Sequence, residues 1–121
     1  MPLRILVVDD NQEVADFLAA SFEQWGYRTA TAYCGVTGLA MARAMRPDVV
    51  LLNVCMPRMS GLAVLKELRG DPATAGLKVI LTSALGNVRE LAEEAGAQDA
   101  IFCLDLVKVV RGRVEKVLAG A

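Results

Sequence analysis

Two adjacent acids, Asp9 and Asp10, stand directly after a run of four aliphatic residues near the start of the chain. Asn53 follows a second run of four, and the hydroxyl residues Thr82 and Ser83 follow a run of three. Two carboxylates beside another oxygen ligand suit a hard divalent cation such as Mg²⁺. A hydroxyl group nearby suits an oxyanion held by that metal. The plainer interpretation of Asp9 and Asp10 alone is a strand end and a helix cap, where Asp is favoured.

The absence of one residue type and the number of another limit the chemistry further. The chain has no histidine, which removes Ser-His and Cys-His catalysis and most zinc sites. Its three cysteines, Cys34, Cys55 and Cys103, are odd in number and widely spaced, so they do not indicate a disulfide framework. We expect a reduced, cytosolic protein in which Cys55 and Cys103 are small buried residues, with a redox pair as the alternative.

The bulk composition indicates one folded domain. The 121 residues are 55% hydrophobic and 22% charged, which favours a packed core over disorder. We therefore expect a single domain over residues 1–121. The apolar runs are too short to cross a bilayer, and the start of the chain carries no signal-peptide pattern. A net charge of −1 predicts no affinity for nucleic acid or for an anionic membrane.

Strand-like and helix-like segments alternate five times along the chain. The expected strands are residues 3–8, 27–32, 48–53, 77–82 and 99–103. A helix is expected after each strand. Regular alternation of this kind predicts an α/β fold, with a parallel sheet, right-handed crossovers and helices on both faces.

The spacing of apolar residues predicts which side of each helix faces the core. The inward residues expected in the first helix are Val14, Phe17, Leu18, Ser21, Phe22 and Trp25. Those expected in the second are Val36, Leu39 and Ala40. We interpret Phe22 and Trp25 as core residues rather than as a partner patch, because they complete a regular apolar stripe.

A parallel sheet would bring the candidate chemical groups together, because ligands bind beyond the carboxyl ends of the strands in an open sheet of this type. The side chains expected at this rim are those of Asp9, Asp10, Asn53, Thr82, Ser83 and Cys103. The backbone carbonyl of Cys55 would add one more oxygen ligand for a metal.

Five motifs occur in order on the elements expected to carry them. They are residues 5–11 (ILVVDDN), 47–53 (PDVVLLN), 56–61 (MPRMSG), 79–84 (VILTSA) and 95–99 (AGAQD). With these motifs the sequence resembles the response-regulator receiver domain of two-component signalling over nearly all of its 121 residues. The resemblance implies a flavodoxin-like receiver fold, with five helices around a five-stranded parallel sheet in the order 2-1-3-4-5.

The resemblance also implies a role for each rim residue. Receivers hold Mg²⁺ on the acids after strand one, which correspond to Asp9 and Asp10. The hydroxyl after strand four senses the phosphoryl group, and it corresponds to Thr82 or, one residue further on, to Ser83. The aspartate that accepts the phosphoryl group from a histidine kinase corresponds to Asn53. Because two of the three acids remain, any Mg²⁺ bound here is expected to be held weakly.

Three functional positions depart from the family pattern. Asn53 replaces the phosphoacceptor aspartate, Cys103 replaces a lysine that pairs with the phosphoryl group, and Ala100 replaces an aromatic switch residue. An amide is not a nucleophile comparable to a carboxylate, so Asn53 cannot form an acyl phosphate, although its oxygen could still be a weak metal ligand. The family's lysine offsets the negative charge of three neighbouring carboxylates. With one carboxylate lost at Asn53, that positive charge is needed less, so the changes at Asn53 and Cys103 are consistent with each other.

The resulting interpretation is a degenerate receiver, a non-enzymatic module that acts by phosphorylation-independent protein–protein interaction. Its partners would be a histidine kinase, an output domain or another signalling protein. Two alternatives stay open: an ordinary phosphoacceptor receiver with an engineered Asp-to-Asn substitution at residue 53, and a flavodoxin-like cofactor binder. Cys103 in place of lysine argues against the first, and the lack of a glycine-rich phosphate loop argues against the second.

The last third of the chain suggests a partner surface. The expected fourth helix carries Arg89, Glu90, Glu93 and Glu94, and the last helix carries Lys108, Arg111, Arg113 and Lys116. In receivers the fourth helix, fifth strand and last helix form the usual output or dimer face. An acidic helix beside a basic one would support a symmetric homodimer. A solvated charged face is the plain alternative.

Overall fold

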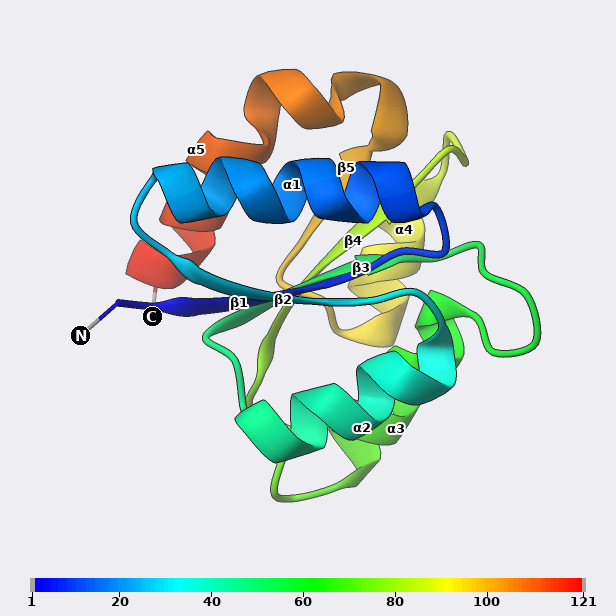
Figure 1. Ribbon diagram of the computed structural model, residues 1–121. Coiled ribbons are helices and arrows are strands. Elements are labelled where there is room, and N and C mark those ends of the chain that lie inside the picture. The colour runs from blue at the N-terminus through cyan, green and yellow to red at the C-terminus, as the bar shows by residue number, and fades with distance from the viewer. Residues whose placement is uncertain (1, 121) are drawn as a thin grey trace.

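A five-stranded parallel sheet forms the middle layer of the molecule (Figure 1). The computed structural model describes residues 2–120. The strands are β1 (Arg4–Val8), β2 (Arg28–Ala32), β3 (Val49–Asn53), β4 (Lys78–Ser83) and β5 (Asp99–Phe102). The helices are α1 (Gln12–Gln24), α2 (Gly35–Met45), α3 (Gly61–Gly70), α4 (Val88–Ala95) and α5 (Leu106–Ala119), with a 3₁₀ turn, η1, at Cys103–Asp105. The strand order is β2-β1-β3-β4-β5, so the expected fold class and strand order are confirmed.

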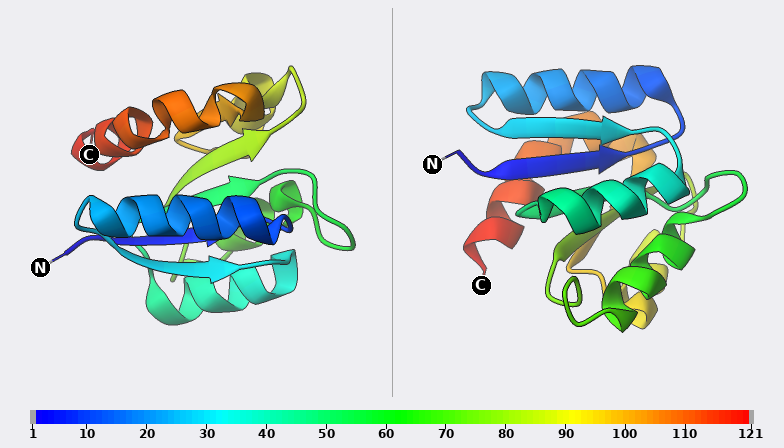
Figure 2. Two further views of the ribbon diagram at one scale, coloured as in Figure 1. Left: turned by 45° about the horizontal axis from the view of Figure 1, so that its top comes forward. Right: turned by 60° about the horizontal axis from the view of Figure 1, so that its bottom comes forward.

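Helices cover both faces of this sheet (Figure 2). α1 and α5 lie on one face, and α2, α3 and α4 lie on the other. Because successive side chains of a strand point to opposite faces, each central strand contributes to two cores. Ile5 and Val7 pack with α1 and α5, whereas Leu6 and Val8 pack with the other three helices. Burial on both faces explains why the central strands are apolar almost throughout.

Polar caps and a glycine fix the ends of the helices that flank the rim. The side-chain oxygen of Asn11 accepts a hydrogen bond from the Val14 N–H at 3.2 Å, and so begins α1. The Ser60 hydroxyl accepts one from the Ala63 N–H at 3.1 Å and begins α3. Gly26 follows α1 with a φ of 96°, a left-handed conformation that glycine adopts without strain.

α2 packs against the sheet through its smallest residues. The buried residues of α2 are Gly38 and Ala42, together with Gly35, which lies against Met59 in the loop after β3. A Cβ atom on Gly38 would lie 2.6 Å from Cγ1 of Val8, so the helix backbone lies very close to β1. This close approach turns Val36, which is 66% exposed, and Ala40 toward solvent. The prediction that these two residues face inward is therefore wrong, whereas Leu39 does pack against the core.

The predicted stripe of α1 is right for most of its length. Phe22 is fully buried, and the half-buried Trp25 packs edge-on against it with ring centroids 5.0 Å apart, so both belong to the core as expected. Phe17 is 55% exposed, so its predicted inward position is wrong. The buried face of α1 is centred on Ala15, Leu18 and Phe22, and Phe17 lies outside it.

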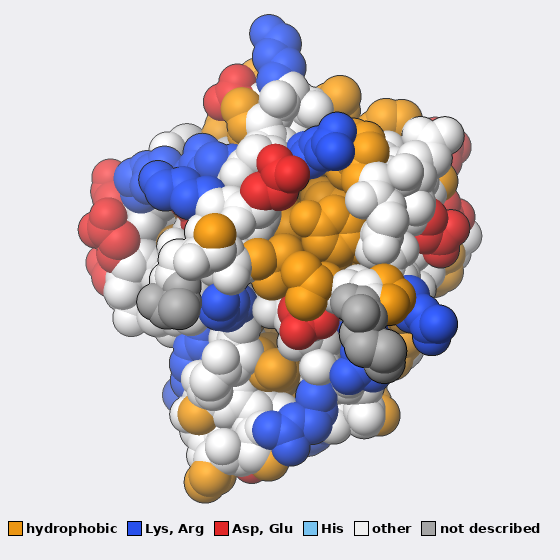
Figure 3. Space-filling model, turned by 90° about the vertical axis from the view of Figure 1, so that its left-hand side faces the viewer, with side chains coloured by type: hydrophobic (Ala, Val, Ile, Leu, Met, Phe, Trp, Pro, Cys, Tyr) orange, Lys and Arg blue, Asp and Glu red, His pale blue; other side chains and the backbone are white. Residues whose placement is uncertain are grey.

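The end of the molecule at which the strands begin carries a hydrophobic surface. Figure 3 shows hydrophobic side chains gathered in the middle of this face, with charged side chains around them. Leu3, Pro47, Leu77 and Leu118 help to line a pocket of about 270 Å³ there. Since the pocket lies at the amino ends of the strands, it is separate from the candidate chemical groups. Within residues 2–120, no helix has the length and apolar character needed to cross a membrane.

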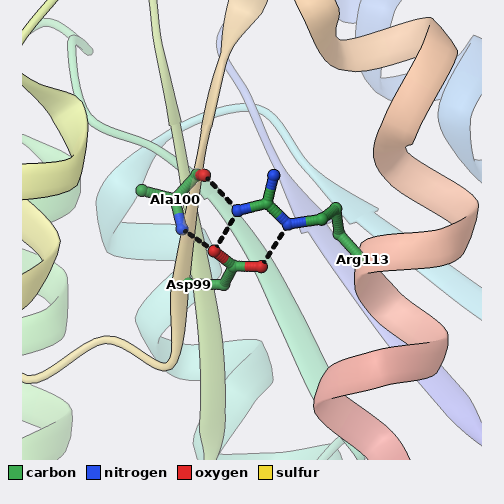
Figure 4. Close-up of polar contacts among 3 residues, drawn as sticks. All are labelled: Asp99, Ala100 and Arg113. Carbon is green, nitrogen blue, oxygen red and sulfur yellow. Dashed lines mark hydrogen bonds and ion pairs between the residues drawn. The ribbon is translucent and has the colours of Figure 1, made fainter.

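An ion pair joins α5 to the start of β5 (Figure 4). Arg113 Nε donates to Asp99 Oδ2 at 2.6 Å, and Nη2 donates both to Asp99 Oδ1 and to the Ala100 carbonyl. Asp99 Oδ1 also accepts the Ala100 N–H at 2.8 Å. Burial alone would raise the pKa of Asp99, but the bonds from Arg113 and Ala100 and the positive charge of Arg113 hold that pKa below its ordinary value.

Replacing Gly38 with alanine should lower the free energy of unfolding by about 1–3 kcal/mol, because the new Cβ meets the stiff Val8 side chain in a filled core. Urea unfolding measures the loss. Gly112 in α5 is the matched control, because nothing lies within 4 Å of its Cβ position. Gly112→Ala should instead stabilise the fold by about 0.5–1 kcal/mol. Equal effects at the two glycines would contradict the close approach of α2.

Replacing Arg113 with glutamine should lower the free energy of unfolding at neutral pH by about 1–3 kcal/mol, because the Asp99 carboxylate loses a charged donor. The pKa of Asp99 is lower in the folded than in the unfolded chain. The pair therefore stabilises the fold above the unfolded pKa and loses that contribution as the pH falls through the folded pKa. Urea unfolding over a pH series should show the difference between the two proteins shrinking in acid.

Arg43→Gln is the control for this experiment. It breaks an ion pair with Asp71 that is 3.7 Å long and more exposed, so the loss should be about 0–1 kcal/mol. A difference between native protein and the Arg113 variant that stays constant down to strongly acid pH would show that the ion pair is not its source.

Candidate functional site

The carboxyl ends of the strands meet at a cleft of about 640 Å³. The predicted rim residues that line it are Asp9, Asp10, Asn53, Cys55, Thr82 and Cys103. The register of the sheet accounts for their meeting, because Val8 pairs with Leu52 and Asn53 pairs with Thr82 on neighbouring parallel strands. The turn after β1 and the loop after β3 therefore leave the sheet side by side.

The Asn53 side chain is the centre of the polar contacts in this cleft. Its amide nitrogen, Nδ2, donates to Oδ1 of Asp10 and to the backbone carbonyl of Cys55, each at 3.1 Å. A longer contact of 3.4 Å joins Nδ2 to Oδ1 of Asp9. The same oxygen of Asp9 accepts the Asn11 N–H at 2.9 Å, which fixes the turn before α1. One amide thus joins the turn after β1 to the loop after β3.

The cleft has an acidic floor. Asp9 is 9% exposed, whereas Asp10 and Glu13 are exposed. Burial raises the pKa of the Asp9 carboxyl, the Asn11 N–H lowers it, and the neighbouring Asp10 raises it again, so that the net pKa lies above its ordinary value. Among the described residues that line the cleft, none is lysine or arginine.

The oxygen atoms expected to hold Mg²⁺ do lie together, but they face a hydrogen-bond donor. The Asp9 and Asp10 carboxylates and the Cys55 carbonyl converge on Asn53 Nδ2, where a cation would need their lone pairs at about 2.0–2.1 Å. Asn53 was expected to offer its amide oxygen as a weak ligand, and it presents its nitrogen instead. Within residues 2–120, no group of three or more His, Cys, Asp or Glu side chains is placed to hold a metal. The donor set in this arrangement does not fit the ion.

The two candidate hydroxyls have different environments. Thr82 is 5% exposed and lines the cleft. Ser83 is 1% exposed, does not line the cleft, and accepts the Leu85 N–H at 3.0 Å with its hydroxyl oxygen. Thr82 is therefore the hydroxyl at the rim, and Ser83 fixes the turn after β4.

The remaining predicted positions lie around β5. Cys103 begins η1 and is exposed at the rim, and Ala100 is 3% exposed inside β5. Cys55 is exposed as well, so the expectation that Cys55 and Cys103 are buried is wrong. Both residues lie in connections that follow the carboxyl end of a strand, where the chain has left the core. All three cysteines are free thiols.

Several residues that line the cleft were not predicted for this site, and three of them add charge or exposed apolar surface. Glu13 and Phe17 reach it from the first turns of α1, and Val107 reaches it from the first turn of α5. The available signal was their position in the sequence, about one turn after a rim residue for Glu13 and Val107 and about two turns after one for Phe17. The apolar periodicity hid it, because it assigned Phe17 to the core.

Comparison with known proteins agrees with this fold. The response regulator receiver domain matches residues 5–103. The DNA-binding dual master transcriptional regulator RpaA of Synechocystis is 33% identical over 98 residues, which are 79% of this chain and 41% of that protein. Response regulator PleD of Caulobacter vibrioides is 41% identical over 101 residues, which are 82% of this chain and 22% of that protein.

A solved structure gives the same result in three dimensions. The signal receiver domain of a signal transduction histidine kinase from Syntrophus aciditrophicus superimposes with a TM-score of 0.87 at 30% identity, covering 98% of this chain and 92% of that one. The chain spans less than half the length of the two curated relatives. The predicted receiver resemblance is confirmed, and the chain belongs to the response regulator receiver domain family of two-component signal transduction.

Proposed function

We propose that this receiver domain works without being phosphorylated and transmits its signal by binding other proteins. The observation that carries the proposal is Asn53, an amide where receivers carry the phosphoacceptor aspartate. The nitrogen lone pair of an amide is delocalised and its oxygen is uncharged, so Asn53 lacks the nucleophile that phosphoryl transfer needs. Its hydrogen bonds to Asp10 and to the Cys55 carbonyl also support the proposal, because the oxygens that would bind a metal already accept from an amide.

The charge of the cleft supports the same proposal. Asp9, Asp10 and Glu13 line it, and Cys103 stands where receivers carry a lysine that pairs with the phosphoryl group. A phosphoryl group brings further negative charge, which nearby carboxylates repel unless a cation offsets them. The cleft therefore disfavours both the approach of a phosphodonor and the phosphorylated product.

The surroundings of the cleft suit binding better than catalysis. Phe17 and Val107 line it and are 55% and 69% exposed, and Leu104 in the adjoining turn is 78% exposed. Exposed apolar side chains grouped beside a polar site are typical of interaction surfaces. We infer a non-enzymatic, cytoplasmic module whose partner is a histidine kinase, an output domain or another signalling protein. A net charge of −1 favours a protein over a nucleic acid as that partner.

An ordinary receiver with a substituted nucleophile is the second candidate function. One observation favours it: Thr82 pairs with Asn53 across the sheet and lines the cleft with both acids, as a working site would require. Cys103 weighs against it, because a single substitution at residue 53 would leave the lysine in place. We therefore rank it below the phosphorylation-independent receiver.

A second copy of this domain is a further proposed partner, bound in a symmetric dimer through α4, β5 and α5. α4 is acidic and α5 is basic, which suits reciprocal pairing. Two of the basic residues of α5 are already engaged within the chain, however. Arg113 binds Asp99, and Arg111 lies 4.7 Å above the Trp25 ring. The surface therefore supports a weak dimer rather than an obligate one.

Incubation of the native domain with acetyl phosphate and Mg²⁺ should leave its intact mass unchanged, because residue 53 offers no nucleophile. Intact-mass spectrometry is the measurement. A stable adduct of one phosphoryl group on the native protein would contradict the proposed function.

Two variants make that result informative. Asn53→Asp combined with Cys103→Lys restores both the nucleophile and the cation, and it should become phosphorylated. Asn53→Asp alone should be phosphorylated at most weakly, because the cleft still lacks the cation. Full phosphorylation of the single variant would favour the second candidate function.

Sedimentation velocity should show a monomer that pairs only at high protein concentration. Glu93→Lys on α4 should weaken this pairing, because it removes an acidic partner for α5 and introduces a like charge. Glu67→Lys, an equally exposed change on α3, is the matched control and should leave the association unchanged. A native domain that stays monomeric at the highest attainable concentration would exclude the dimer.

A further inference from the structure

We infer that the side-chain amide of Asn53 takes the place of a divalent cation in this receiver, so that the acidic site is held in its folded arrangement without a metal ion. The inference concerns how the site is built. It does not depend on whether the domain acts by protein binding.

The contacts of one nitrogen atom carry this inference. Three oxygens surround Asn53 Nδ2: those of Asp10 and Cys55 at 3.1 Å, and that of Asp9 at 3.4 Å. They come from two segments far apart in the sequence, the turn after β1 and the loop after β3. A bound cation would draw the same oxygens together. Here two N–H groups do so, with two direct hydrogen bonds and one longer contact.

The chemistry of the neighbours fixes which end of the amide faces them. Two carboxylates and a carbonyl are all acceptors, so they repel the amide oxygen and attract the amide nitrogen. Hydrogen bonds from a donor to a carboxylate are among the stronger ones in proteins. Turning the amide over would place an oxygen among three oxygens, so Asn53 keeps its donor end inward.

The same arrangement reduces the need for a counter-charge. An aspartate at residue 53 would place a third carboxylate beside Asp9 and Asp10, and like charges at this distance are costly without a cation. Asn53 removes that charge and supplies donors to the remaining two. A Mg²⁺ ion entering this site would have to break the two hydrogen bonds of the amide before it gained its ligands.

Asn53→Ala isolates the effect of the amide, because it keeps both acids and the Cys55 carbonyl and removes the whole side-chain amide, both its N–H donors and its oxygen. Native and variant domains are stripped of metal and then titrated with MgCl₂, with chemical shifts of backbone amides and the thermal midpoint as readouts. The variant should bind Mg²⁺ at least about tenfold more tightly than the native domain, because the ion no longer competes with hydrogen bonds to charged acceptors. Its thermal midpoint should rise with Mg²⁺, whereas the native midpoint should not.

Asn53→Asp is the second variant, and it covers the case in which the alanine variant folds poorly. With three carboxylates and no donor, it should be less stable than the native domain without metal and should recover stability as Mg²⁺ is added. Asn87→Ala, an exposed asparagine at the start of α4, is the control and should behave as the native protein does. Equal Mg²⁺ affinity in the native domain and in both Asn53 variants would overturn the inference.

These readouts separate the inference from the proposed function. A native domain that binds Mg²⁺ as tightly as the variants, yet forms no phosphoryl adduct, would contradict the inference without contradicting the proposed function. A native domain that is phosphorylated, but whose thermal midpoint does not change with Mg²⁺, would contradict the proposed function without contradicting the inference.

Discussion

The constraint on which the rest of this molecule depends is the register of β1, β3 and β4. These strands are parallel and buried on both faces, so a shift of one residue would turn every side chain to the opposite face. The observed register sets Val8 beside Leu52 and Asn53 beside Thr82. Asp9 and Asp10 follow directly on Val8, and Asn53 and Thr82 are themselves one of these pairs. The cleft is therefore a consequence of how the hydrophobic strands align, and its polar residues contribute little to choosing the fold.

Much of the fold could be predicted from the sequence, because the signals that specify it are local. Alternating strand-like and helix-like segments gave the five strands to within about one residue at each end, with a helix after each strand. The positions that could not be predicted depend on contacts between distant segments. Gly38 decides the orientation of α2, because a glycine opposite Val8 lets the helix approach β1 closely. The spacing of apolar residues could not show this, because a hydropathy pattern does not mark glycine as a residue that faces the core. Phe17 failed for a related reason: its spacing fits the stripe, but it lines the open cleft together with Val107 of α5 and stays 55% exposed.

The candidate site shows the same division. The types of its residues, and their meeting at one rim, followed from the position of each residue after a strand. The direction of the Asn53 amide did not, because it is set by acceptors that come from the turn after β1 and from a backbone carbonyl two residues away. A backbone carbonyl has no signature in a sequence. For the same reason Asn53 could be foreseen as a lost nucleophile and a weak metal ligand, whereas its contacts make it a hydrogen-bond donor that joins two segments of the site.

A donor that is covalently attached to the chain has a consequence for signalling. A metal ion or a phosphoryl group can come and go, so a site that depends on either can change its state with them. The amide of Asn53 is always present, so on the inference above the site it holds keeps one arrangement whatever the Mg²⁺ concentration. Any shift between conformations of this domain must then come from a partner that binds one conformation more tightly than another, and the shift can be no larger than that difference in affinity. The exposed Phe17 and Val107 lie where such a partner would contact both α1 and α5 beside the acidic floor. Under the proposed function, partners recognise this receiver by its shape and its surface, while the acids that remain in its cleft stay hydrogen-bonded to Asn53.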